Sequence, residues 1–120
     1  MPYTLEHSKT GGYLVSRHQG DVNAAELRAA RQDAINLRAE TGAKRLLIDF
    51  REASSIPGIG DSYFIAQEAA ASSSKATRTA VVARSEHFEI ARFAAFAAKT
   101  AGLIVRTFED EVEAIRWLLA

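Results

Sequence analysis

The segment Arg45-Leu46-Leu47-Ile48-Asp49-Phe50 constrains the fold of this chain more than any other. It is a nearly continuous apolar run of strand length, which is typical of a strand buried on both faces in a parallel sheet. Such a strand requires covering layers on both sides of its sheet. We therefore expect an α/β architecture, in which helices connect and cover parallel strands.

The rest of the sequence supplies strands and helices in alternation after an N-terminal pair of strands. The turn signal Gly11-Gly12 separates two short strand-like segments and predicts an antiparallel hairpin. Asn23 and Glu26 have the spacing of a helix capping box, and Gly42 is suited to the helix C-terminus. We expect strands at 3–8, 13–18, 45–50, 79–83 and 103–108, and helices at 24–40, 62–72, 86–100 and 109–119. The expected fold is one α/β domain, residues 1–120, with a mixed sheet and the order β-β-α-β-α-β-α-β-α.

Composition excludes several classes of protein. Fifteen basic and 15 acidic residues balance, which argues against binding to nucleic acid through phosphate neutralisation. Without cysteine there is no disulfide framework and no thiolate site. His7, His18 and His87 lie in separate segments and lack metal-ligand spacing, so we expect no metal and no cofactor. No apolar run approaches the roughly 20 residues of a membrane span, and no signal peptide is evident. A cytoplasmic location is therefore expected.

Alanine accounts for 23 of the 120 residues. Several of these alanines fall on the apolar stripes of the expected helices, where they favour close packing on the sheet or leave room for a pocket. A pocket between sheet and helices would suit a carrier of a small molecule or lipid.

Three segments together resemble the STAS-like, SpoIIAA-like family, which is related to bacterial anti-sigma-factor antagonists. They are Gly20-Asp21-Val22 leading into Glu26-Leu27, the strand Leu46–Phe50, and the C-terminal stretch Thr107–Leu118. The resemblance implies a non-enzymatic regulatory or ligand-binding domain. In the classical antagonists a partner kinase phosphorylates the serine of an Asp-Ser pair before the helix that follows the third strand. Here Pro57-Gly58 stands in that place, so the resemblance does not carry a phosphorylated serine onto this chain.

The carboxyl ends of the parallel strands form the edge where ligands bind in sheets of this type. Arg51 and Arg84 each directly follow an expected strand, and the helix starts near Asp61 and Ser85 offer free N–H groups to an anion. We therefore predict a rim site for a small anionic ligand or a phosphorylated side chain. The alternative is a capped turn with two solvated arginines. The rim residues are Arg51, Ser54, Ser55, Gly58, Gly60, Asp61, Ser62, Arg84 and Ser85.

Two other features have open interpretations. Phe93 and Phe96 lie on a mixed face of their helix, which predicts a surface for a protein partner or a homodimer, unless a neighbouring helix covers them. Asp49 ends a buried strand, where an unpaired carboxylate is costly, so it either caps the following turn, as we expect, or works in a site.

The sequence thus favours a non-enzymatic regulatory or interaction domain. A small-molecule or lipid carrier is the first alternative. A small hydrolase using Ser55 or Ser62 is a weaker one, because serine, histidine and aspartate counts alone do not identify a triad.

Overall fold

The computed structural model describes residues 3–8, 11–72 and 77–120. They form one five-stranded sheet and four helices in the expected chain order. The elements are β1 (Tyr3–Ser8), β2 (Tyr13–Asp21), α1 (Ala24–Thr41), β3 (Arg45–Ser55), α2 (Ile59–Ser72), β4 (Arg78–Val82), α3 (Ser85–Thr100), β5 (Ile104–Phe108) and α4 (Glu111–Leu119).

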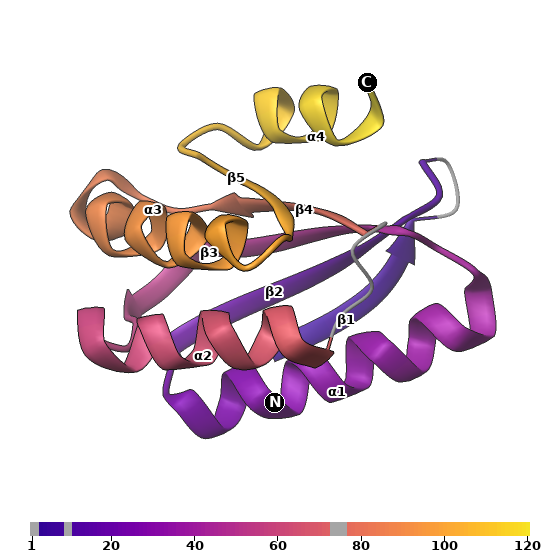
Figure 1. The fold of residues 1–120 in the computed structure, drawn as a ribbon. Coiled ribbons are helices and arrows are strands. Elements are labelled where there is room, and N and C mark those ends of the chain that lie inside the picture. The colour runs from indigo at the N-terminus through magenta and orange to yellow at the C-terminus, as the bar shows by residue number, and fades with distance from the viewer. Residues whose placement is uncertain (1–2, 9–10, 73–76) are drawn as a thin grey trace.

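The sheet has the strand order β1-β2-β3-β4-β5. β1 pairs antiparallel with β2, and every later pair is parallel, which confirms the predicted mixed sheet. Because neighbouring strands follow the chain order, right-handed crossovers place α1, α2 and α3 on the same face. α4 packs on the opposite face, against β3, β4 and β5 (Figure 1).

The ends of α1 follow from its sequence. The Asn23 side chain accepts a hydrogen bond from the Glu26 N–H at 2.8 Å, as predicted for the N-cap. Gly42 ends the helix with φ of 74°, a left-handed conformation that glycine adopts without steric cost.

Several boundaries differ from the expectation, and β2, β3 and α2 differ by three residues or more. β3 does not end at Phe50 but continues to Ser55, because β2 also continues and pairs with it through Gly20 and Asp21. This extension contains register shifts, and Gly20 has φ of 69°, so backbone pairing rather than an apolar pattern holds it. α2 begins at Ile59, which places Gly60 and Asp61 inside its first turn. Arg84 is the N-cap residue of α3, so this helix begins at Ser85, one residue before the expected start.

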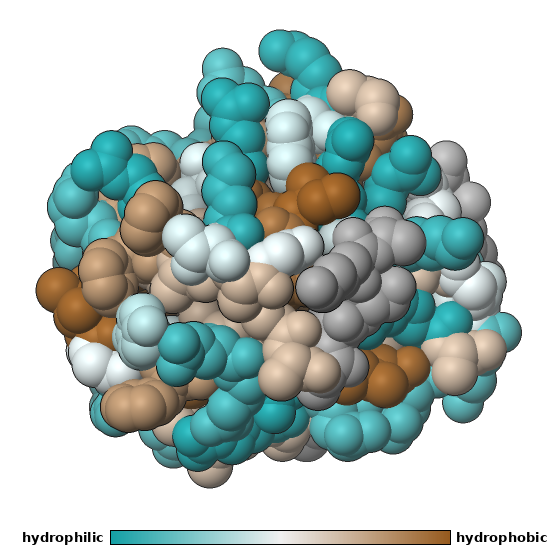
Figure 2. Space-filling view, in the orientation of Figure 1, coloured by the Kyte–Doolittle hydropathy of each residue, from teal (hydrophilic) through white to brown (hydrophobic). Residues whose placement is uncertain are grey.

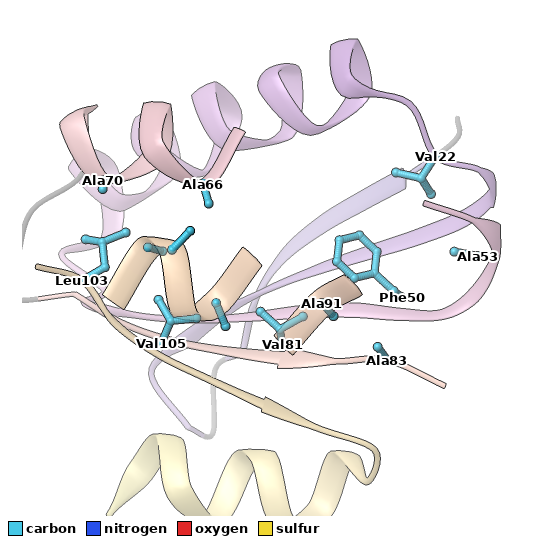
Figure 3. Packing of buried hydrophobic residues seen from close by; sticks show 13 residues of the cluster. Val22, Phe50, Ala53, Ala66, Ala70, Val81, Ala83, Ala91, Leu103 and Val105 are labelled. Carbon is cyan, nitrogen blue, oxygen red and sulfur yellow. The ribbon is translucent and has the colours of Figure 1, made fainter. Parts of the chain in front are cut away.

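The sheet has a core on each face. Between the sheet and α4, Leu47, Val82, Phe108 and Leu118 are buried. On the other face the core contains Phe50, Val81 and Val105 from the sheet, opposite alanines of α2 and α3. In Figure 3 Phe50, Val81 and Val105 point from the sheet toward the helices, while Ala66 points from α2 toward the sheet.

Candidate functional site: a polar cluster beside an apolar cavity

A cavity of about 200 Å³ lies between the sheet and helices α1, α2 and α3. Its sheet side includes Ile48, Phe50, Val81 and Val105. Its helix side is built mainly of alanines, whose methyl groups fill little of the space between the layers. They are Ala30 and Ala34 of α1, Ala66 and Ala69 of α2, and Ala91, Ala94, Ala95 and Ala98 of α3.

Two polar side chains of β2 line this cavity. Ser16 and His18 are two residues apart, so the strand pleat places both on the face that α1 covers. Both are buried, and Ser16 Oγ lies 2.6 Å from His18 Nε2. The other ring nitrogen, His18 Nδ1, lies 2.7 Å from Glu26 Oε2. Glu26 stands in the first turn of α1, so the cap that starts this helix also positions the carboxylate beside β2.

The imidazole of His18 is held in one orientation. Its ring stacks on Tyr3 with centroids 5.5 Å apart and packs against Phe50 at 5.2 Å. Burial lowers the pKa of His18 below its ordinary value of 6.5, against the opposing hydrogen bond and charge of Glu26. His18 is therefore neutral at pH 7. We assign the proton to Nδ1, which donates it to the Glu26 carboxylate, so that Nε2 accepts from the Ser16 hydroxyl.

Arg31 brings a second polar group to the same cavity. Its Nη2 lies 3.6 Å from Glu68 Oε2. Its Nη1 is buried and has no hydrogen-bond partner among the residues that the structure describes. An unpaired buried donor costs about 1–3 kcal/mol, and Arg31 is one of the residues that line the cavity.

The opposite face of the sheet holds an ionic network centred on Asp49. Arg51 contacts this buried carboxylate with both arms of its guanidinium, at 3.0 Å from Nε to Oδ1 and 2.8 Å from Nη2 to Oδ2. The Arg51 N–H also donates to Oδ1 at 3.0 Å, and Arg17 makes a further ion pair. Glu111, the first residue of α4, accepts from Arg17 at 2.7 Å and pairs with Arg51 at 3.1 Å.

This network fixes α4 to β2 and β3. Burial alone would raise the pKa of Asp49, but the hydrogen bonds and charge of Arg51, aided by Arg17, hold it below its ordinary value. The hydrogen bond that Arg51 donates to Asp49 in turn raises the pKa of Arg51. No turn follows Asp49, because β3 continues past it to Ser55, but its Oδ1 still accepts from the backbone N–H two residues on, as a capping aspartate does.

The two arginines of the predicted rim do not share one partner. Arg51 belongs to the Asp49 network, whereas Arg84 donates to the Ala53 carbonyl at 2.8 Å and pairs with Glu86 at 2.8 Å. An anion at this rim would therefore compete with acceptors already in place. The rim site stays a prediction.

The rim serines have local acceptors. Ser54 and Ser55 donate to Asp21 Oδ1 at 3.1 and 2.8 Å, and Ser62 donates to the Pro57 carbonyl at 2.8 Å. A Cβ atom added at Gly58 or Gly60 would meet nothing within 4 Å, so the fold itself does not require glycine at either position.

Aromatic side chains cover the outer faces of α2 and α3. Phe96 is 62% exposed and Phe93 is 39% exposed. Phe93 packs on Tyr63 of α2, with ring centroids 6.1 Å apart, and Tyr63 contacts the exposed Phe64 at the same separation. Figure 2, drawn in the orientation of Figure 1, shows brown hydrophobic surface at several separate places among the teal hydrophilic surface. We call Tyr63, Phe64, Phe93 and Phe96 the aromatic patch.

Sequence reasoning did not single out the Ser16–His18–Glu26 cluster. Its signal was the serine-x-histidine alternation on a strand, followed by a carboxylate at the third position of the next helix. Serine and histidine at this spacing share a strand face, but the partner of each depends on the packing of α1. In the described parts of the chain no group of three metal-ligating side chains occurs. Nor does any described helix have the length and apolar character needed to cross a membrane.

The sheet order, the hairpin and the placement of α4 define a STAS-like α/β domain. The family model of SpoIIAA-like proteins matches residues 13–119, and the chain belongs to this family. No curated protein matches the chain in sequence.

Two solved structures share the fold. One is an uncharacterised protein from Shewanella loihica PV-4 with a SpoIIAA-like fold, 19% identical, with a TM-score of 0.61 over 97% of this chain and 91% of that one. The other is the anti-sigma factor antagonist SpoIIAA in its unphosphorylated form, 21% identical, with a TM-score of 0.55 over 96% of each chain.

Proposed function

We propose that this SpoIIAA-like domain is a non-catalytic regulatory module that binds a small apolar molecule between its sheet and helices α1–α3. The observation that carries this proposal is the cavity of about 200 Å³. An apolar cavity of about 150 Å³ in another protein binds benzene. The space in this chain therefore suits a single ring or a short alkyl chain.

Polar groups at the cavity narrow the class of ligand. Arg31, whose Nη1 has no hydrogen-bond partner among the described residues, brings a guanidinium to the cavity lining. Ser16 brings a hydroxyl group that donates to His18. A ligand with an apolar body and one acceptor group, such as a carboxylate, would satisfy Arg31 and fill the space between the alanines.

Benzene and benzoate are suitable probes, because they share a ring and differ in the carboxylate. Binding is followed by calorimetry and by the shift in urea unfolding, where a ligand at 100 times its Kd adds about 2.7 kcal/mol of stability. We expect both to bind, and Arg31→Met to weaken only benzoate. Ala66→Leu should abolish binding of both, whereas Ala71→Leu, at an exposed site of the same helix, should not. Failure of both probes to bind the parent chain would contradict the proposal.

A second candidate function is contact with a protein partner through the aromatic patch. The exposure of Phe64 and Phe96, 62% each, favours it, because contiguous exposed apolar area usually has a role. A homodimer through Phe93 and Phe96 is one form of this contact. Light scattering tests it directly, and a monomer at all concentrations would exclude the homodimer.

A further inference from the structure

We propose that Ser16 is a nucleophile, activated by His18 and Glu26, that accepts the acyl group of an activated ester or thioester of a short apolar acid. This inference rests on the proposed function to the extent that the acyl group must enter the cavity that Ser16 lines. It differs from the rim-serine hydrolase expected as a weak alternative, since Ser55 and Ser62 donate to Asp21 and to a carbonyl oxygen.

The geometry is that of a nucleophile, a base and an orienting carboxylate. Ser16 Oγ lies 2.6 Å from His18 Nε2, and Glu26 Oε2 lies 2.7 Å from His18 Nδ1. Both separations fall in the range that general-base activation of a hydroxyl requires. Glu26 acts as a positioning residue, because its carboxylate holds the tautomer in which Nε2 is free to take the serine proton.

The two hydrogen bonds also satisfy both ring nitrogens of the buried histidine. The feature that points to chemistry is that Ser16 lines a space that an acyl group can occupy. Ser62 is a built-in comparison: it is also buried and lines the same cavity, but its hydroxyl donates to the Pro57 carbonyl.

The step balances with the groups present and one acyl donor. Ser16 Oγ attacks the carbonyl carbon of the ester, its proton passes to His18 Nε2, and a new Oγ–C bond forms. The bond between the carbonyl carbon and the leaving oxygen or sulfur breaks, and His18 returns the proton to that leaving group. The products are acyl-Ser16 and a free alcohol or thiol.

Release of the acyl group would require water at His18 Nε2. An acyl group on Ser16 would itself occupy the cavity of about 200 Å³ and take the space that such a water needs. We therefore infer that each chain is acylated once at Ser16 and does not turn over rapidly, which is compatible with a regulatory domain.

The test uses the full chain and p-nitrophenyl butyrate, with intact-mass and peptide mass spectrometry. We expect the mass of one butyryl group, located on Ser16 and not on Ser62. His18→Gln and Glu26→Gln should slow labelling by roughly 100-fold, the contribution typical of general-base catalysis. Ser62→Ala is the matched control and should label at the parent rate. Circular dichroism checks that each variant is folded. If a variant does not fold, peptide mapping of the butyryl group on the parent chain still shows whether Ser16 is acylated.

Several results would overturn the inference. They are no adduct on Ser16 in the parent chain, equal labelling of Ser62, or an unchanged rate in folded His18→Gln. Benzene binding tests the proposed function, whereas labelling of Ser16 tests this inference, so the two can fail separately. Benzene binding without labelling of Ser16 removes the nucleophile and leaves the binding module intact. Labelling that saturating benzene slows supports both, whereas labelling that benzene does not slow places the reaction outside the cavity and refutes the inference.

Discussion

Replacing Ala66 by leucine adds three carbon atoms to the side of α2 that faces the cavity. Removing a leucine side chain down to alanine leaves a cavity of about 150 Å³ in a packed protein core, so a cavity of about 200 Å³ has room for the reverse change. Burying three further carbons contributes about 2.4 kcal/mol at ~0.8 kcal/mol each. Fixing the leucine rotamer costs about 0.5–1 kcal/mol. We therefore expect the free energy of unfolding to rise by about 1.5 kcal/mol.

Urea unfolding followed by circular dichroism measures this change. The midpoint should move to higher urea with an unchanged slope m, which shows that stability and not compactness has changed. Thermal unfolding should shift upward by roughly 6 °C for a domain of this size. The control is Ala71→Leu on the exposed side of α2, which we expect to stay within about 0.5 kcal/mol of the parent.

The opposite sign would refute the reasoning. If helices and sheet are in close contact at this place, the leucine overpacks the core and costs about 1–3 kcal/mol. A destabilised but folded Ala66→Leu chain would therefore remove the cavity, and with it the proposed binding of apolar molecules.

Three further changes test other parts of the structure. The pKa of His18 is lowered in the folded chain, so as the pH falls below about 6.5 the unfolded chain takes up a proton that the folded chain does not. The free energy of unfolding, measured in urea, should therefore decline between about pH 7.5 and pH 5. His18→Gln should make the free energy of unfolding less dependent on pH over this range. Asp49→Asn leaves two arginines without their buried carboxylate and should cost about 2 kcal/mol, less than the 3–5 of a fully buried pair because both guanidinium groups are partly exposed. The pKa of Asp49 is also lowered, so below about pH 4 the Asp49→Asn variant should lose less stability than the parent chain. The control is Glu89→Gln in an exposed ion pair, which should change stability by less than about 0.5 kcal/mol. Phe96→Asp should leave unfolding nearly unchanged, and light scattering should show a loss of association if the aromatic patch is an interface.

The order of elements could be predicted because each depends on local signals. The apolar run at 45–50 identified the central strand, and Asn23 with Gly42 marked the ends of α1. The extension of β3 to Ser55 has no such signal. It depends on hydrogen bonds from the neighbouring strand, and the stretch from Arg51 to Ser55 lacks the apolar pattern of a buried strand.

The candidate site could be predicted only in part. Alanine-rich helices suggested room for a pocket, and the cavity lies where those alanines meet the sheet. No local pattern in the sequence pairs His18 with Glu26, because the contact depends on how α1 packs over β2. The rim site was predicted from a rule about strand ends that applies to many sheets of this type. In this chain the arginines placed there already contact Asp49, Glu111, Glu86 and a carbonyl oxygen.

Helices α2 and α3 connect the cavity to the aromatic patch. Their inner faces supply Ala66 and Ala95 to the cavity, and their outer faces carry Phe64 and Phe96. These alanines do not fill the space between the layers, so a molecule bound there would contact both helices. Its contacts would stabilise one position of the two helices against the sheet. A partner that binds the patch contacts the same two helices from outside. Binding inside and outside would then be linked through the position of one helix pair, and by reciprocity each would alter the affinity of the other by the same factor.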